Sequence, residues 1–599
     1  MPSRFFKFRE SINLRIFSSK NSVIFILRTL SLLVFLLVIG TGIYYYGFPK
    51  THHSLLLTER IIEWSLAFFS LKYLLYVFYD FHPKEFLKKN WIEGLVLLFF
   101  IFYILFPTLF NDVLFNVFFN DIIENHSLLL FQLYFISIFF VELGKSGPKI
   151  TALNLKPTTM LILSFVILIG TGTGLLMLPE MTTHHSFNFL NALFTATSAS
   201  CVTGLIVVDT ATFFTLKGQI IIMLLIQLGG INMISFATFF ATFSKSSGSI
   251  KYQSMIKEVL SAERLSDSKH LLRSIIIFSL LIETLGTVLM YFSWGNYTFA
   301  HWQTKLFYSL FHAVSAFNNA GFSVFSSNLY QTGIQHLYGL QIIIMFLIFF
   351  GGFGFMAMED VFSIKRIKQR FKMPWKKLNV GTRITLYVSL TLIAIGALGF
   401  YLLERNHILA GDGIIQTIVT SLFQSVTTRT AGFNTVDISK LTTPVLLLFI
   451  FLMFIGAGSG STGGGIKVST FAVILKSAIA TIKGEKNVVF FKRTIPFSIV
   501  DRAYSIALFS IFIIFISAFL LTITEPDVPF IKLLFEEFSA YGTVGLSTGI
   551  TSTLSEAGKS IIITSMFIGR IGSLTLAMAL SSRAFYTKFK YAEASVMVG

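Results

Sequence analysis

Long apolar runs alternate with short polar segments along most of this chain. Crossing a bilayer as a helix takes about 20 predominantly apolar residues, and the N-terminal quarter contains four runs of about that length. They lie at 23–46, 60–80, 92–110 and 127–144. The later runs form four pairs: 159–178 with 217–243, 274–293 with 336–356, 384–403 with 444–475, and 503–523 with 558–580. The pattern predicts an all-α polytopic membrane protein with about twelve transmembrane helices.

The composition agrees with this pattern. Hydrophobic residues make up 54% of the 599 residues and charged residues 13%, about half the charged share of a soluble domain. The first apolar run is longer than the core of a signal peptide, so we interpret it as a retained span. The single cysteine, Cys201, excludes an intrachain disulfide framework.

The formal net charge of +18 is concentrated at the N-terminus and in alternate loops. The loops predicted on the side of the basic N-terminus are 81–91, 145–157, 244–273, 357–383 and 476–502. Because Lys and Arg in short loops mark the cytoplasmic side, this charge is a topology signal and does not indicate nucleic-acid binding. It predicts a multi-pass membrane protein with both termini in the cytoplasm. The expected location is the cell inner membrane.

One short segment recurs between the two members of each later pair. The four copies are LFTATSASCVTGL (193–205), LFHAVSAFNNAGF (310–322), LFQSVTTRTAGF (422–433) and LFEEFSAYGTVGL (534–546). Each begins with Leu-Phe and closes on Gly followed by Leu or Phe, and the third copy is one residue shorter before its glycine. The closing glycines are Gly204, Gly321, Gly432 and Gly545.

These segments are too short to cross a bilayer, so we interpret them as re-entrant half-helices followed by extended backbone. Such backbone is tolerated at membrane depth only where it lines a cavity or is buried in protein. Carbonyl oxygens of four loops around an axis can replace the hydration shell of a potassium ion. The C-terminal ends of the half-helices would favour a cation there. The alternative for any single copy is that its small residues serve helix–helix packing.

At these residues the sequence resembles the Trk/Ktr/HKT superfamily of potassium transporters, and in particular a bacterial TrkH/KtrB-type membrane subunit with an extra N-terminal transmembrane region. The resemblance covers about 158–585 and includes the stretches GLIVVDT, IQLGGINMISFATF and GAGSGSTGGGIKVSTF. It implies four M1–P–M2 repeats in pseudo-fourfold arrangement around a pore. The chain would then divide into an N-terminal extension of about four helices (1–150), repeat 1 (151–250), repeat 2 (251–365), repeat 3 with an intramembrane gating loop (366–490), and repeat 4 with a short cytoplasmic tail (491–599).

The resemblance also implies a potassium filter. Its residues would be Val202, Thr203, Gly204, Asn319, Ala320, Gly321, Thr430, Ala431, Gly432, Thr543, Val544 and Gly545. All four glycines are present, a pattern that the family associates with potassium preference, whereas sodium-preferring plant relatives replace the first glycine by serine. The loops differ from the uniform Thr-Val-Gly-Tyr-Gly of potassium channels.

A glycine-rich stretch interrupts the apolar run 444–475. Its residues include Gly456, Gly458, Ser459, Gly460, Ser461, Thr462, Gly463, Gly464 and Gly465. A phosphate-binding P-loop would need Gly-Lys-Ser/Thr after its glycines, but Ile466 separates Gly465 from Lys467 here. The resemblance implies an intramembrane gate below the filter, and a simple helix kink is the alternative.

One charge stands inside the last predicted span. Arg570 lies in FIGRIGSLTLA, and intramembrane charges usually face a cavity or a partner. The resemblance implies that Arg570 lies below the filter as an electrostatic barrier.

The expected function is potassium uptake through a channel-like pore, with potassium as substrate, no organic cofactor and no enzymatic activity. A sodium-permeable or sodium-coupled transporter of the same superfamily is the alternative. Secondary transporters of other folds often show two inverted halves, whereas this repeat is fourfold. The resemblance implies a homodimer and a cytoplasmic Rossmann-type nucleotide-binding regulatory subunit of the TrkA/KtrA kind.

Overall fold

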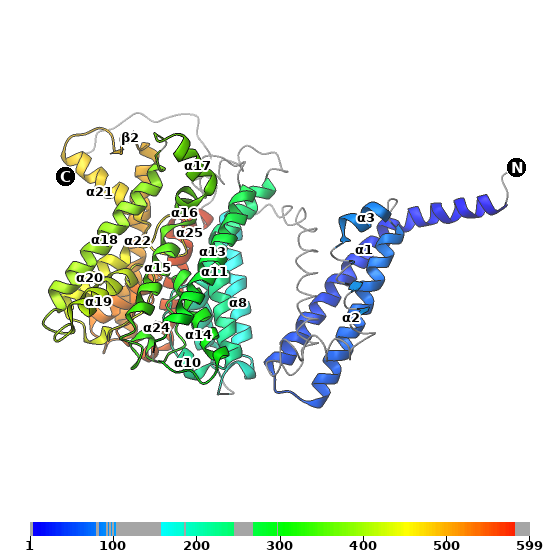
Figure 1. The fold of residues 1–599 in the computed structure, drawn as a ribbon, viewed down its shortest axis with the longest axis horizontal. Helices are drawn as coiled ribbons and strands as arrows, with labels where there is room; N and C mark the ends of the chain where they lie inside the picture. Colours follow the sequence, from blue (N-terminus) through cyan, green and yellow to red (C-terminus); the bar gives the residue numbers. More distant parts are fainter. Residues whose placement is uncertain are drawn as a thin grey trace. The chain divides into compact units, whose positions relative to one another are not determined.

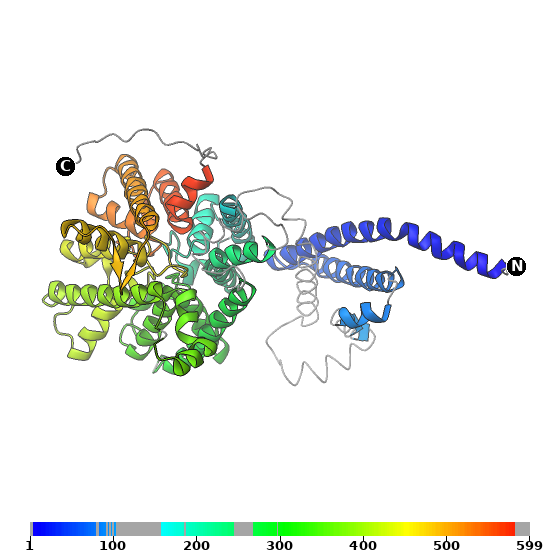
Figure 2. The same cartoon turned by 90° about the horizontal axis from the view of Figure 1, so that it is seen from above.

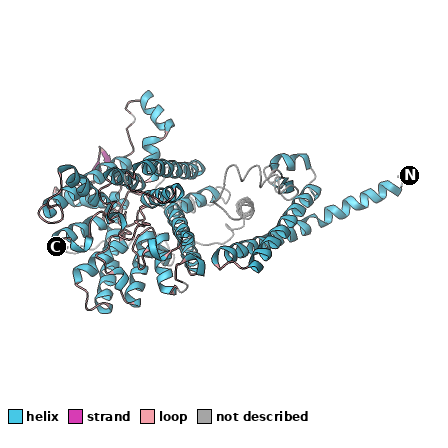
Figure 3. Ribbon diagram, turned by 60° about the horizontal axis from the view of Figure 1, so that its bottom comes forward, coloured by secondary structure: helices cyan, strands magenta, loops and turns pink. Residues whose placement is uncertain are grey.

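The computed structural model describes residues 4–79, 83–91, 94, 97–98, 101–102, 157–184, 187–244, 268–295, 297–375 and 377–580. It is almost entirely helical, with one short hairpin (Figure 3). The chain divides into two compact units. The first consists of Met1–Asn154 and Leu178–Glu180, and the second of Leu155–Met177 and Met181–Gly599.

The first unit contains two long helices that pack against each other (Figure 1). They are α1 (Arg4–Gly47) and α2 (His52–Tyr79), and the short helix α3 (Pro83–Lys89) follows. The spans predicted at 23–46 and 60–80 therefore correspond to helices. The spans predicted at 92–110 and 127–144 lie largely outside the described residues.

The second unit repeats one order of elements four times. An outer helix is followed by a short helix and then by an inner helix. The outer helices are α8 (Pro157–Leu176), α13 (Ser268–Ser293), α18 (Val380–Glu404) and α22 (Phe497–Thr524). The short helices are α9 (Phe189–Ser200), α14 (Trp302–Phe317), α19 (Ile414–Thr427) and α23 (Phe530–Tyr541). The inner helices are α11 (Leu216–Ser244), α15 (Tyr338–Phe353), α20 (Thr443–Phe454) and α24 (Glu556–Ile571).

Smaller elements connect these helices. They are α10 (Thr210–Phe213), α16 (Phe355–Phe362), α17 (Ile364–Lys372), α21 (Val468–Ile482), α25 (Ser573–Leu580) and the 3-10 turns η2 (Pro179–Met181), η4 (Asn328–Tyr330), η5 (Ile438–Lys440) and η6 (Thr551–Thr553). Strands β1 (Val489–Phe490) and β2 (Arg493–Thr494) pair antiparallel.

The inner helix of each repeat packs against the short helix of the next. Helix α11 contacts α14, α15 contacts α19, α20 contacts α23, and α24 contacts α9. These four contacts close a ring, and Figure 2 shows the segments following one another around it in the order of the chain. The short helices are the most buried elements, with every residue from Phe194 to Ser200 of α9 buried.

The outer helices carry large apolar side chains on the outside. On α22, Leu508, Phe512, Phe515 and Phe519 are all exposed. An exposed apolar stripe of this length on a helix of 28 residues suits lipid contact. Among the described residues, six helices are long and apolar enough to cross a membrane: α1, α2 and the four outer helices.

The inner helices differ from the prediction of continuous spans. At Gly354 the chain bends by 102° between α15 and α16, and a second break at Gly572 separates α24 from α25. Both glycines have φ near +92° (93° and 92°), a conformation that L-residues with a side chain rarely adopt. The predicted spans 336–356 and 558–580 are therefore interrupted, while α11 continues without a break.

Basic segments gather at one end of the second unit. Helix α17, which carries Arg370 and Lys372 in its last turn, lies at the same end as the β-hairpin, and α10 lies at the other end (Figure 1). Asp360 accepts hydrogen bonds from Arg366 at 3.0 Å and from Arg370 at 2.8 Å. Two of the five predicted basic loops, 357–383 and 476–502, thus have described elements at the same end of the second unit.

Candidate functional site

Four short loops follow the short helices and share one backbone conformation. We call them the glycine loops: 202–204, 319–321, 430–432 and 543–545. Their first residues, Val202, Asn319, Thr430 and Thr543, have φ of 57°, 60°, 72° and 48°, and their glycines have φ of 92°, 69°, 76° and 92°. Positive φ is uncommon and costly for a residue with a side chain. Its recurrence at the same place in four repeats shows that the repeated sequence encodes a repeated, strained structure.

The glycine loops form a closed ring in chain order. A Cβ atom on Gly204 would collide with the carbonyl oxygen of Ala320, and one on Gly321 would lie 2.7 Å from that of Ala431. A Cβ atom on Gly432 would likewise collide with the carbonyl oxygen of Val544, and one on Gly545 with that of Thr203. Each glycine therefore leaves space that the backbone of the next loop occupies. All twelve predicted filter residues lie in this ring.

The short helices point their C-terminal ends at the ring. Each ends one or two residues before its glycine loop, at Ser200, Phe317, Thr427 and Tyr541. The carbonyl end of a helix carries a partial negative charge of about half an elementary charge. Four such ends directed at one place favour a cation there.

A hydroxyl group in each short helix fastens its glycine loop. Ser198 Oγ accepts a hydrogen bond from the backbone N–H of Gly204 at 3.1 Å, and Ser539 Oγ accepts one from Gly545 at 3.1 Å. Ser315 Oγ donates to the carbonyl of Phe322 at 2.8 Å, and Thr427 Oγ1 donates to that of Phe433 at 2.6 Å. These four residues were not among the site residues predicted from the sequence. The signal was present, because each lies five residues after the leucine of its Leu-Phe pair.

A second polar position in three of the short helices fastens the chain after the loop. His312 Nε2 and Ser323 Oγ are 3.0 Å apart, and Gln424 Nε2 donates to Thr435 Oγ1 at 3.0 Å. Thr551 Oγ1 donates to Glu536 Oε1 in the fourth repeat. These side chains lie behind the ring and hold the segment that leaves it.

The glycine-rich stretch forms a loop between α20 and α21, which we call the central loop (455–467). Its two ends meet, because Gly456 N–H donates to Ile466 O at 2.8 Å and Val468 N–H donates to Ala457 O at 3.2 Å. Within the loop, Ser459 is exposed and contacts Ser469 at 2.8 Å, and Ser461 is buried. The predicted interruption of the span 444–475 is thus a folded loop and not a simple helix kink.

The central loop lies directly against the glycine loops of the third and fourth repeats. Gly464 N–H donates to Thr543 Oγ1 at 3.0 Å, and a Cβ atom on Gly463 would collide with Thr430 Oγ1. Thr462 Oγ1 donates at 3.3 Å to the carbonyl of Phe317, the last residue of α14. Side chains at Gly463 or Gly464 would not fit, so glycine lets this backbone approach the ring.

The broken inner helix of the second repeat supports the central loop. Gly458 N–H donates to Gly352 O at 2.8 Å, and Phe355 N–H donates to Gly460 O at 2.9 Å. A Cβ atom on Gly354 would lie 2.5 Å from Ser459 O. The helix break at Gly354 therefore makes room for the loop and binds it.

Three cationic side chains bind carbonyl groups of the central loop. Lys467 Nζ donates to Gly463 O at 2.5 Å, and Arg570 Nη1 donates to Thr462 O. Arg429 Nη2 donates to Gly456 O at 3.3 Å. Among the described residues, no carboxylate pairs with any of the three, so each cation is bound by neutral groups that include a carbonyl of the central loop.

Arg570, on the fourth repeat, binds backbone of both the first and the third repeat. It is only 1% exposed, and its Nη2 donates to Gly229 O at 2.7 Å on α11. It follows Gly569, whose position leaves space for the carbonyl of Tyr541 at the end of α23. The predicted intramembrane charge therefore lies beside the central loop.

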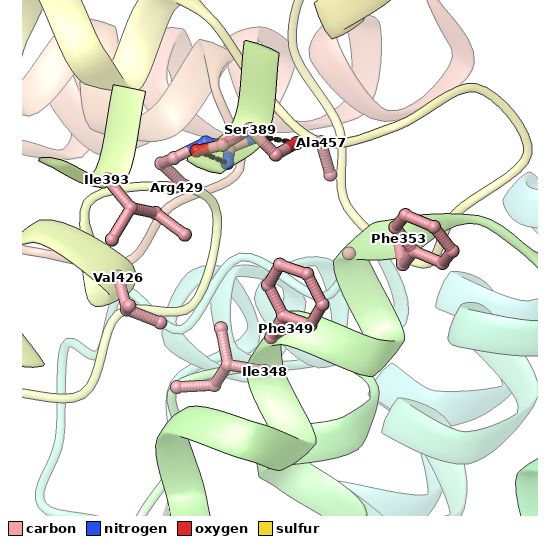
Figure 4. A pocket seen from close by; sticks show the side chains of 9 residues that line it. Ile348, Phe349, Phe353, Ser389, Ile393, Val426, Arg429 and Ala457 are labelled. Carbon is pink, nitrogen blue, oxygen red and sulfur yellow. Dashed lines mark hydrogen bonds between the residues drawn. The ribbon is translucent and has the colours of Figure 1, made fainter. Parts of the chain in front are cut away.

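Arg429 was part of the repeated segment but had no assigned role. Its guanidinium donates to Ser389 O at 3.2 Å and Ser389 Oγ at 3.1 Å, so it joins α18 to the start of the central loop. Figure 4 shows it with Ser389 and Ala457 above a small cavity of about 20 Å³. A charge in a re-entrant segment is a signal of such a buried contact.

Comparison with known proteins decides the family. The family model of TrkH, described as a cation transport protein, matches residues 126–586 of this chain. The chain belongs to the TrkH family. Members of this family are ion transporters and not enzymes, in agreement with the sequence analysis.

Curated relatives of this TrkH-family chain are named for potassium uptake. The chain is 39% identical to Ktr system potassium uptake protein B of Bacillus subtilis over 445 residues, which cover 74% of this chain and 97% of the relative. It is 40% identical to the protein of the same name from Vibrio alginolyticus, over 74% of this chain and 94% of the relative. It is 35% identical to the potassium/sodium uptake protein NtpJ of Enterococcus hirae, over 74% of this chain and 98% of the relative.

The fold has a solved counterpart. The crystal structure of the potassium transporter TrkH from Vibrio parahaemolyticus superposes with a TM-score of 0.58 at 18% identity, covering 75% of this chain and 91% of that chain. This similarity shows that the TrkH-family chain has the all-α polytopic fold predicted from its sequence.

Proposed function

We propose that this TrkH-family protein is the membrane subunit of a potassium uptake system, and that the ring of glycine loops is its selectivity filter. The observation that carries the proposal is the closed ring itself, with positive φ at two positions of every loop. In such a ring, backbone carbonyl oxygens can replace the water around a potassium ion. The partly negative ends of four short helices stabilise the dehydrated ion. Potassium is the substrate, and the mechanism needs no organic cofactor.

The central loop is proposed as the gate. It lies against the third and fourth glycine loops through Gly463 and Gly464, and it is held by Arg429, Lys467 and Arg570. The positive charges of these residues lie below the proposed filter, where they repel a potassium ion that leaves it. An ion that leaves the ring toward α21 must therefore displace the loop.

A sodium-permeable or sodium-coupled transporter is the second candidate. The similarity to a relative named for potassium and sodium uptake favours it. The intact glycine in the first loop, Gly204, favours potassium, because it has positive φ like the closing glycines of the other three loops.

The names of two relatives support a proposal about assembly. The words "Ktr system" in the names of two relatives indicate uptake machinery with more than one component. We propose a homodimer in the cell inner membrane, with both termini cytoplasmic, regulated by a cytoplasmic Rossmann-type nucleotide-binding subunit of the TrkA/KtrA kind. The first unit of the chain is proposed to be an N-terminal transmembrane extension.

The proposal is tested with the purified full-length chain in proteoliposomes. Uptake of rubidium, used as a potassium tracer, is measured against competing potassium, sodium or lithium. We expect potassium to compete at least tenfold more strongly than sodium, a difference of about 1.4 kcal/mol. Equal competition by sodium would support the second candidate, and no tracer uptake in any salt, with or without a nucleotide-binding subunit, would overturn both.

A further inference from the structure

A carboxyl group in the middle of an outer helix is bound behind the second glycine loop. Glu283 lies on α13 and is 4% exposed. Its Oε2 accepts from Gln227 Nε2 at 3.0 Å on α11, and its Oε1 accepts from Asn318 Nδ2 at 3.2 Å at the end of α14. Asn318 Nδ2 also donates to Gln227 Oε1 at 2.7 Å. Three helices from two repeats therefore meet in one polar cluster, Gln227–Glu283–Asn318.

This cluster touches the proposed filter directly. Asn318 is the C-cap of α14 and precedes Asn319, the residue with φ of 60° that opens the second glycine loop. Asn318 Nδ2 also donates to Val314 O at 3.0 Å, which fixes the side chain against its own helix. The position of Glu283 therefore bears on the position of the loop backbone.

A buried carboxyl group within a membrane span is costly and needs a reason. In the central parts of the four outer helices, Glu283 is the one charged residue; the other outer helices carry their charges only near their ends, for example Arg383 and Glu404 on α18. A packing role alone would be served by an apolar side chain at lower cost.

The cluster also reaches the central loop. The same stretch of α11 that contains Gln227 continues to Gly229 and Gly230, whose carbonyl groups accept from Arg570 at 2.7 and 3.4 Å. A Cβ atom on Gly230 would collide with Asn318 Oδ1. A continuous chain of contacts thus runs from Glu283 on the outer helix through Asn318 and α11 to Arg570, which binds the central loop.

We infer that Glu283 is a positioning residue that sets the cation preference of the second glycine loop. Two N–H donors, from Gln227 and Asn318, converge on it, and a carboxyl group can accept from both with separate oxygens. A glutamine in its place would direct an NH2 group at one of these donors. The backbone of the second glycine loop would then no longer be held at a fixed distance from α11. Its carbonyl oxygens could move to fit ions of different size, so the preference for potassium would fall. This inference rests on the proposed function of the ring.

The test is Glu283→Gln in the full-length protein, reconstituted in proteoliposomes. Rubidium uptake is measured with sodium and potassium as competitors, and folding is followed by size-exclusion chromatography in detergent. We expect the preference for potassium over sodium to fall by roughly tenfold, as for the loss of a hydrogen bond to a charged group, while the protein still elutes as one species. Ser279→Ala is the matched control. Ser279 lies one turn earlier on α13, is fully buried, and its hydroxyl has no hydrogen-bond partner among the described residues, so its loss should leave the preference unchanged.

A rescue experiment separates positioning from general stability. In the double variant Glu283→Gln with Asn318→Asp, the amide is at position 283 and the carboxyl group at position 318. The amide of Gln227 can turn over so that its NH2 group donates to the carboxyl group at position 318. The double variant should regain part of the preference and not all of it, because Asn318→Asp also removes the hydrogen bond that Asn318 donates to Val314 O. Asn318→Asp alone, which in addition faces two carboxyl groups toward each other, should lose the preference. If Glu283→Gln does not fold, the comparison of Asn318→Asp with the double variant decides the question.

Two results would count against the inference. A folded Glu283→Gln protein with unchanged preference overturns it, and so does a double variant as unselective as Asn318→Asp. A wild-type protein that shows no potassium preference would instead overturn the proposed function, so the two failures are distinguishable.

Discussion

At the scale of single residues, the ring depends on positions where a side chain has no room. Gly204 and Gly545 both have φ of 92°, and a Cβ atom on either would meet a carbonyl oxygen of the neighbouring loop. The closing glycines were identified from the sequence because they end a repeated segment. The collisions could not be predicted, since they involve loops more than a hundred residues apart in the chain.

Gly204→Ser tests whether the ring needs a residue without a side chain at this position. The added Cβ and hydroxyl should displace the Ala320 carbonyl and reduce the preference for potassium over sodium by at least about tenfold, a change of about 1.4 kcal/mol. Competition of sodium with rubidium uptake measures it. Gly549→Ser is the matched control, because Gly549 has the same φ of 92° but no atom within 4 Å of its Cβ position. Equal behaviour of the two variants would show that Gly204 does not line the ion path.

At the scale of elements, the central loop is the part that sequence reasoning described least completely. Six glycines within ten residues predicted that no stable helix would form. The contacts of Gly458 with Gly352 and of Phe355 with Gly460 come from the broken helix of another repeat. The break at Gly354 was not predicted, since nothing in the sequence distinguishes Gly354 from Gly351 and Gly352, which lie within the helix α15.

Deleting residues 457–464 tests the central loop as a gate. The geometry allows the deletion, because a Cβ atom on Gly465 would lie 3.5 Å from Cα of Gly456, so the new ends are already adjacent. We expect rubidium uptake without a regulatory subunit to rise at least tenfold over wild type, through removal of a barrier of about 1.4 kcal/mol or more.

The control for this deletion is Ser459→Ala, which changes only the exposed tip of the loop. It should leave uptake near the wild-type level. If the deletion variant is folded and inserted but its uptake stays low, the central loop is not the gate.

At the scale of the whole molecule, the hydrophobic pattern predicted the fourfold repeat and the fold, and the comparisons confirm the family. It did not predict which elements touch. The packing of each inner helix on the short helix of the next repeat arises between repeats, and the pattern within one repeat does not contain it. The same holds for the hydroxyl groups of Ser198, Ser315, Thr427 and Ser539. They occupy one repeated position in the sequence, but their hydrogen bonds to the chain after each short helix are known only from the structure.

The orientation in the membrane is tested by cysteine labelling. Helix α18 separates two ends of the third repeat: Asn379 at its start binds Asp360 at 2.8 Å, and Glu404 at its other end binds Thr442 N–H at 2.9 Å. Cysteines at Lys368 and Ser439, both exposed, lie beyond these two ends. In a variant without Cys201, a membrane-impermeant maleimide applied to intact cells should label the cysteine at Ser439 and leave the one at Lys368 unlabelled. The reverse pattern would contradict the predicted topology.

The closed ring of four different loops has a consequence for how such a site can change. Because a single chain supplies all four loops, a substitution enters the ring once, whereas in a ring of four identical subunits it would enter four times. The chain already uses this freedom. Asparagine opens one loop, valine another and threonine the remaining two, and the polar residues behind them are a histidine, a glutamine and a glutamate in three of the repeats. Each quarter of the ring can therefore change its first residue by itself, whereas its glycine, whose space the next loop occupies, is the same in all four.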